Sequence, residues 1–96
     1  MNVNDEEVMK IFKNNLVNRI FKLLPEREEE CEYWQDNLED IIVDLKGIMT
    51  VYDKMDDRVS ACHSLIIKLN GIKDVKFEVF RRNIFSAITL VKKIWI

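Results

Sequence analysis

The sequence is poor in the residues that make tight turns, with only two glycines and one proline in 96 residues. An all-β domain of this length needs many tight turns, and glycine and proline are the residues that most often build them. This scarcity therefore excludes a β-rich fold. The length restricts the chain to a single domain, which we expect to span residues 1–96.

Cysteine is also scarce, because Cys31 and Cys62 are the only two. Both fall on apolar positions of a helical pattern, where a free cysteine behaves as a small hydrophobic residue, and two cysteines do not make a disulfide framework. The first seven residues are acidic and lack the apolar segment of a signal peptide. No apolar run approaches the length of a membrane span. We therefore expect a reduced, cytoplasmic protein with no membrane partner.

Catalytic motifs are absent as well. His63 is the single histidine and follows Cys62 directly, and neighbouring residues on a helix point in different directions, so this pair does not form a ready nucleophile and base. The sequence contains no CxxC, HExxH, Walker A or GxGxxG motif. We expect no catalytic residue, no metal and no cofactor, and hence a protein that is not an enzyme.

A long helical periodicity is what the sequence does contain. From Cys31 to Leu69 an apolar residue returns every three or four positions, which predicts an all-α fold, namely a bundle of three to four helices. One unbroken helix over 25–70 is an alternative that would require an oligomer. We expect a homodimer, because the apolar stripe is long. The candidate oligomer seam consists of Trp34, Leu38, Ile41, Leu45, Ile48 and Tyr52.

The helix boundaries follow from capping residues and from the one proline. Asn4 with Glu7 three positions later predicts the start of a first helix. Pro25 is expected to end that helix and to lie in the first turn of the second. Gly47 leaves two alternatives, because it either ends the second helix or lies within it. The apolar period continues beyond Gly47 and favours a second helix that reaches about Lys54.

A third helix is expected from Asp56 or Asp57 to Asn70, with Gly71 as its C-cap.

A fourth helix is expected from about 75 to 94, and it is apolar on one half of its circumference. Phe85 departs from that pattern because it falls among basic residues. It is expected either to contact an acidic protein surface or nucleic acid, or to pack against the first helix or a second copy. The candidate partner-binding residues are Arg81, Arg82, Phe85, Lys92 and Lys93.

Charge is distributed unevenly along the chain. Residues 1–57 carry 7 Lys and Arg against 15 Asp and Glu, a balance of −8, whereas residues 58–96 carry 8 against 2, a balance of +6. Attraction between the two halves favours packing of the basic end on the acidic end, or association of two chains. The candidate acidic surface consists of Glu28, Glu29, Glu32, Asp36 and Glu39.

The residues around 59–94 resemble a degenerate helix-turn-helix. This pattern favours an alternative function, in which the protein is a transcriptional regulator that binds nucleic acid. Arg81 and Arg82 would follow the turn, but Ile67 is large where helices must pack closely. A third possibility is a structural component whose task is to oligomerise.

One pattern runs through most of the chain, in the segments Ile11-Phe12-Lys13, Phe21-Lys22-Leu23-Leu24-Pro25-Glu26, Trp34, Leu38-Glu39, Val43-Asp44-Leu45-Lys46-Gly47-Ile48 and Phe80-Arg81-Arg82-Asn83-Ile84-Phe85. This pattern resembles small uncharacterised helical proteins of phages and prophages in low-GC Gram-positive bacteria. Alanine is rare while isoleucine, asparagine and lysine are abundant, which is typical of an AT-rich genome. The resemblance implies an accessory protein of a phage, virus or mobile element that binds a host or phage protein.

Overall fold

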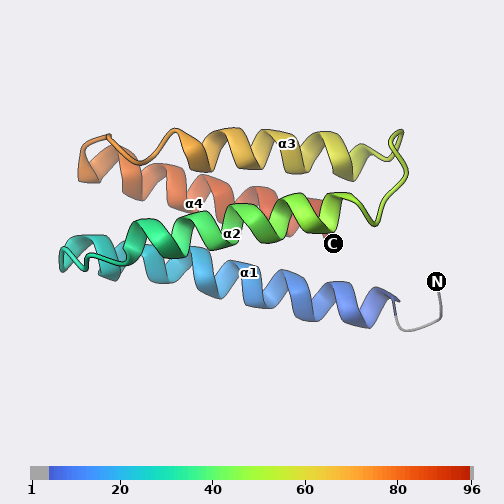
Figure 1. Cartoon of the computed structure of the whole chain (residues 1–96), viewed down its shortest axis with the longest axis horizontal. Coiled ribbons are helices and arrows are strands. Elements are labelled where there is room, and N and C mark those ends of the chain that lie inside the picture. The colour runs from blue at the N-terminus through green and yellow to red at the C-terminus, as the bar shows by residue number, and fades with distance from the viewer. Residues whose placement is uncertain (1–4, 96) are drawn as a thin grey trace.

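A computed structural model describes residues 5–95 of the chain, and within them four helices and no strand are present (Figure 1). The helices are α1 (Asp5–Glu28), α2 (Trp34–Met49), α3 (Asp57–Asn70) and α4 (Phe77–Ile94). The all-α prediction is therefore confirmed. The expected N-cap Asn4 lies outside the described residues. None of these four helices has both the length and the apolar character needed to cross a membrane.

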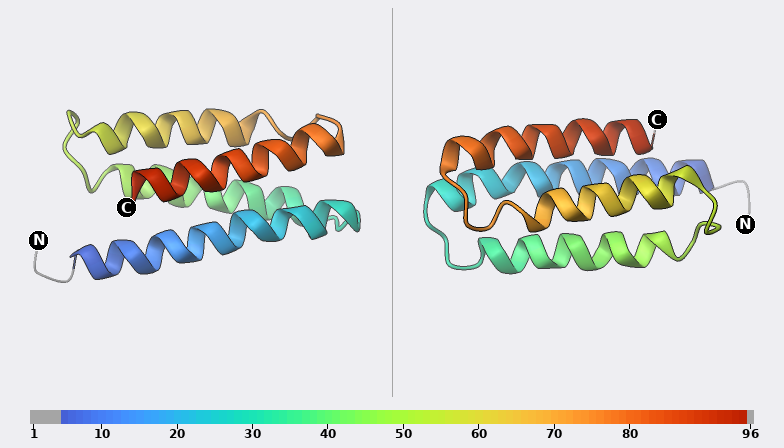
Figure 2. Two further views of the ribbon diagram at one scale, coloured as in Figure 1. Left: turned by 180° about the vertical axis from the view of Figure 1, so that it is seen from behind. Right: turned by 90° about the horizontal axis from the view of Figure 1, so that it is seen from above.

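The four helices lie side by side and alternate in direction along a body of 42 × 22 × 20 Å (Figure 2). Each helix packs against two others: α1 against α2 and α4, and α3 against the same two. The pairs α1–α3 and α2–α4 therefore lie across the diagonals. As a consequence, the first and the last helix of the chain are direct neighbours.

The core draws on all four helices, and it uses the residues of the predicted oligomer seam. The side chains of Trp34, Leu38, Ile41 and Leu45 are at most 9% exposed. Ile48 and Tyr52 are half-buried. The first five pack in the core of the same chain, and the Tyr52 hydroxyl contacts Met9 and Trp95. A dimer would therefore have to use a different surface.

Pro25 lies inside α1, so the prediction that it ends the first helix and opens the second is wrong. Proline lacks the N–H group that would bond within the helix, which costs stability. Its neighbours Leu23 and Leu24 are nevertheless buried. Their packing holds the chain in the helical conformation until Glu28, and tertiary contacts here outweigh the local preference.

The turn after α1 has the hydrogen-bond pattern of a Schellman motif. The N–H of Cys31 donates to the carbonyl of Glu26, and the N–H of Glu30 donates to the carbonyl of Arg27, both at 2.9 Å. Glu30 occupies the left-handed position, with φ of 56°, where glycine is the usual residue. The chain reverses direction here, and α2 begins at Trp34.

The second helix ends at Met49, so its expected continuation to Lys54 is wrong. Gly47 does not end the helix either, because it lies within the last turn. Its carbonyl accepts hydrogen bonds from the N–H of Thr50 at 3.2 Å and from the hydroxyl of the same residue at 2.7 Å. The single helix over 25–70 is excluded by the turns that follow α1 and α2.

The third helix begins and ends as predicted. The carboxylate of Asp56 is its N-cap and accepts a hydrogen bond of 2.9 Å from the N–H of Arg58. Gly71 is the C-cap, but its φ of −82° lies in the right-handed region. No left-handed glycine is therefore required at this helix end.

The fourth helix begins two residues later than expected, with Lys76 as its N-cap, and it ends at Ile94 as predicted. α3 and α4 run antiparallel along their length (Figures 1 and 2). The helices of a helix-turn-helix cross at about 90–120° instead. The residues around 59–94 therefore do not form the helix-turn-helix that the alternative function requires.

Candidate functional site

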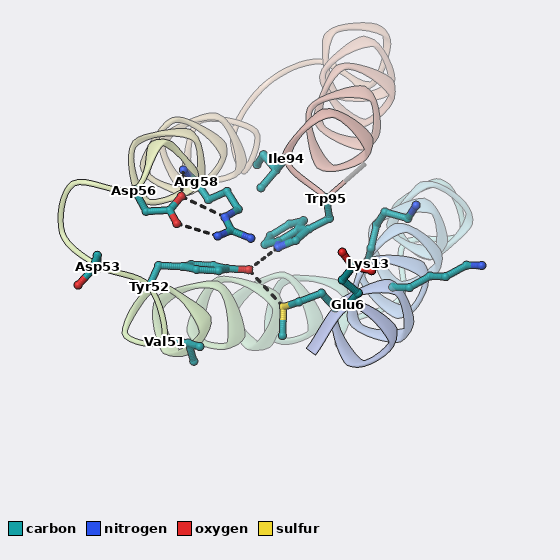
Figure 3. Close-up of a pocket in the computed structure, with 11 residues that line it drawn as sticks. Glu6, Lys13, Val51, Tyr52, Asp53, Asp56, Arg58, Ile94 and Trp95 are labelled. Atoms are coloured by element: carbon teal, nitrogen blue, oxygen red, sulfur yellow. Dashed lines mark hydrogen bonds and ion pairs between the residues drawn. The ribbon is translucent and has the colours of Figure 1, made fainter. Parts of the chain in front are cut away.

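A hollow of about 800 Å³ opens at one end of the protein (Figure 3). The N-terminal turns of α1, the loop after α2 and the C-terminal end of α4 meet there. Its wall includes Glu6 and Lys13 from α1, Tyr52 and Asp53 from the loop, and Trp95 after α4. Because side chains from three parts of the chain surround one space, it is a candidate for a ligand site.

Several polar groups of this hollow bond to one another. The indole N–H of Trp95 donates to the hydroxyl of Tyr52 at 2.8 Å, and that hydroxyl donates to the sulfur of Met9 at 3.2 Å. The guanidinium of Arg58 lies 4.1 Å from the centre of the Tyr52 ring and donates two hydrogen bonds to the carboxylate of Asp56. In Figure 3 the ion pair of Arg58 and Asp56 lies beside the Tyr52 ring, and a dashed line joins the Tyr52 hydroxyl to the indole of Trp95. We interpret the bond between Tyr52 and Trp95 as a contact that holds the end of α4 on the loop.

Two of the charges in the hollow, those of Asp56 and Arg58, are paired with each other. The hydrogen bonds from Arg58 lower the pKa of Asp56 to about 2, and the same pair raises the pKa of Arg58. Both groups are therefore charged at neutral pH and neutralise each other. An acid or base that works near neutral pH needs a pKa close to 7, and this pair does not supply one.

Cys62 and His63 do not form a reactive pair either. Cys62 is fully buried on α3, and burial raises the pKa of its thiol to about 11. The thiol is therefore protonated and a poor nucleophile at neutral pH. His63 is exposed on the adjacent position. Within residues 5–95, no three His, Cys, Asp or Glu side chains are grouped so that they could hold a metal ion.

Three of the predicted partner-binding residues come together on the exposed side of α4. Arg81, Arg82 and Phe85 line one shallow depression. The ring of Phe85 is 43% exposed and meets the edge of Phe21 from α1, with 6.1 Å between the ring centres. The guanidinium of Arg81 lies 5.7 Å from the centre of the Phe85 ring. Phe85 thus contacts the first helix and still remains accessible.

The two predicted lysines lie further along α4. Lys92 lines a shallow groove between α1 and α4, together with Lys13 and Val17 of α1. Lys93 is exposed but does not line that groove. We call the combined surface the α1–α4 face. It consists of Lys13, Val17 and Phe21 from α1 and of Arg81, Arg82, Phe85 and Lys92 from α4.

The predicted acidic residues are all exposed and follow one another from the end of α1 to α2. Glu28 and Glu29 lie at the end of α1, Glu32 lies in the following turn, and Asp36 and Glu39 lie on α2. Glu39 forms an ion pair with Lys73, which follows α3. This pair joins the acidic and basic halves of the chain, as the charge distribution predicts, although exposed pairs of this kind stabilise a fold only weakly.

Sequence reasoning missed Phe21 and the contact between Tyr52 and Trp95. In the sequence, Phe21 gives the same indication as Phe85, because it also falls outside the apolar face of its helix. In the structure, Phe21 is 51% exposed. The contact between Tyr52 and Trp95 joins residues 43 positions apart. No local pattern reveals such a pair, because it depends on how the helices are arranged.

Comparison with models of protein families, with curated proteins and with solved structures finds no match to this chain.

Proposed function

We propose that this four-helix bundle is a non-enzymatic protein-interaction protein, an accessory protein of a phage, virus or mobile element that binds a host or phage protein. The binding surface in this proposal is the α1–α4 face. The observation that carries it is the exposed edge contact between Phe21 and Phe85, with Arg81 beside the ring. Aromatic residues and arginine are enriched in protein interfaces and dominate their binding energy.

In the proposed homodimer two copies would meet on this same face, so self-association and binding of the partner would exclude each other. The apolar seam lies inside the single chain, which leaves exposed apolar surface such as Phe21 and Phe85 for self-association. Size-exclusion chromatography with light scattering on the native chain and on Phe85→Asp tests this step. A native dimer that becomes monomeric on substitution supports it, whereas a native monomer at micromolar concentration removes the homodimer from the proposal.

Site-specific photocrosslinking tests the binding surface directly. A photoreactive phenylalanine analogue replaces Phe85 in one version and Val43 in the matched control. Val43 is 61% exposed on α2, which lies diagonally across from α4. In an extract of the source cells, we expect a discrete crosslinked protein from position 85 and none from position 43. Identical products from both positions would contradict the proposal.

A second pair of variants separates specific binding from loss of folding. Arg81→Ala combined with Phe21→Ala is expected to reduce the crosslinked product at least tenfold, because both side chains border the aromatic contact. Lys46→Ala on the exposed side of α2 is the control and should leave the product unchanged. Circular dichroism of both variants checks that the helices remain intact.

A further inference from the structure

We infer that the α1–α4 face takes an acidic amphipathic helix, laid along the groove between α1 and α4. This inference rests on the proposed function and specifies the chemistry of the partner. Two helices packed side by side leave a groove between them, and an amphipathic helix can lay its apolar side into such a groove.

The charge of the face selects an acidic partner. Arg81, Arg82 and Lys92 are exposed, and the described residues place none of them in an ion pair. The ion pairs of the described chain use Arg19, Arg58 and Lys73 instead. No carboxylate lines the groove next to Lys92. The positive charge of the face is therefore available to a partner.

One carboxylate lies at the other end of the face. Glu78 borders the depression that holds Arg81 and Arg82. Two arginines against one glutamate still leave this end positive. A partner carboxylate is therefore attracted at both ends of the face, to the arginines at one and to the lysines at the other.

The arrangement of the charges fits a helix of about three turns. Arg81 and Lys92 are eleven positions apart on α4, which corresponds to about 16 Å along the helix axis. Phe85 lies between them and contacts Phe21, and Val17 continues the apolar strip on α1. The complementary helix carries carboxylates near both ends and apolar side chains at intervals of three or four positions between them.

The same face fits nucleic acid less well. A chain of phosphates favours an unbroken row of cations, whereas here an apolar strip separates the arginines from the lysines. The whole chain also has a net charge of −2. Nucleic acid is therefore one of the outcomes to be distinguished by the test.

The test uses two synthetic helical peptides of 21 residues. Both carry leucine at every third or fourth position, and they differ only in having glutamate or lysine at the flanking positions. We expect the glutamate peptide to bind the full chain at least tenfold more tightly at low salt, and its affinity to fall as salt rises. Equal affinity of the two peptides, or no binding of either, would overturn the inference. So would tighter binding of a single-stranded oligothymidine.

Charge-reversal variants test whether the glutamate peptide binds to the α1–α4 face. Arg81→Glu combined with Arg82→Glu should lower the affinity for the glutamate peptide at least tenfold, whereas Lys46→Glu on α2 should have little effect on that affinity. Both substitutions are on exposed positions and should preserve the helices. If the glutamate peptide fails to bind while position 85 still crosslinks a discrete protein, the inference falls and the proposed function stands. If that crosslink is absent as well, both fall.

Discussion

The indole nitrogen of Trp95 donates a hydrogen bond of 2.8 Å to the hydroxyl of Tyr52, and this bond ties the end of α4 to the loop between α2 and α3. Trp95 is only 5% exposed and also packs edge-on against Phe12 of α1. One indole therefore contacts two separate parts of the structure at the same end of the protein.

Removing the hydroxyl tests the contribution of this bond. Tyr52→Phe keeps the ring but leaves the part-buried indole N–H without its protein acceptor, which costs about 0.5–1.5 kcal/mol. We expect the free energy of unfolding, measured by urea denaturation, to fall by that amount. Tyr33→Phe is the matched control because Tyr33 is 55% exposed. Equal effects of the two substitutions would show that the bond does not stabilise the fold.

The left-handed conformation of Glu30 predicts a stabilising substitution. A residue with a Cβ atom is destabilised by roughly 1–2 kcal/mol in the left-handed region. Glu30 lies in this region, and Glu30→Gly removes that strain. The greater flexibility of glycine in the unfolded chain offsets part of the gain. We therefore expect the free energy of unfolding to rise, with a corresponding rise in melting temperature by circular dichroism.

Two controls isolate the conformation from the loss of charge. Glu30→Ala removes the carboxylate but keeps a Cβ atom, so it should not reproduce the gain. Glu28→Gly places glycine in the last turn of α1, where it should destabilise the protein. A stabilisation by Glu30→Ala equal to that by Glu30→Gly would assign the effect to charge.

The N-cap of α3 predicts a specific dependence of stability on pH. Hydrogen bonds from Arg58 lower the pKa of Asp56 to about 2, from a usual value of 3.8. Its ionised form therefore stabilises the fold above about pH 4, and this contribution is lost as the pH falls towards 2. Asp56→Asn keeps a good capping side chain and removes only the charge. We expect the variant to be less stable than the native protein at pH 7.

That difference should disappear as the pH approaches 2, as measured by urea denaturation at a series of pH values. Asp53→Asn is the control, because Asp53 lies in the same loop and forms no ion pair within residues 5–95. A gap between the native protein and Asp56→Asn that stays constant from pH 7 to pH 2 would contradict the assignment.

The two cysteines should differ sharply in reactivity. Burial raises the pKa of the Cys62 thiol to about 11, and its side chain is fully covered, whereas Cys31 is partly exposed. At pH 8 we expect a thiol-specific reagent to modify one thiol rapidly and the second only as the protein unfolds. Cys31→Ser should abolish the rapid phase. Rapid modification of Cys62 in that variant would show that α3 opens readily.

The sequence was sufficient to predict helices and most of their inward faces, because the apolar period is a local property. It failed where tertiary contacts decide the outcome. Pro25 lies inside α1 because Leu23 and Leu24 are buried against the rest of the chain. The position of Gly47 within α2 agrees with the favoured alternative, because a glycine inside a helix costs only about 1 kcal/mol, but the helix ends at Met49 and not at Lys54.

The candidate surface was predicted only on the side of α4. Phe85 was recognisable because an aromatic residue among basic ones departs from the helical pattern, and its neighbours Arg81 and Arg82 came with it. Phe21 completes the surface from a helix some 60 positions earlier, and only the packing of α1 on α4 brings the two rings together. The same reason explains why the hollow at the end of the protein was not predicted.

The neighbouring positions of α1 and α4 have a consequence for how the protein forms during synthesis. α1 is made before the other three helices, yet α4, one of its two packing partners, is made after them. Until α4 leaves the ribosome, the sides of α1 and α3 that it covers remain exposed to water and to other apolar chains. The native arrangement therefore cannot be completed helix by helix as the chain grows, and a stalled or truncated chain would be prone to aggregation.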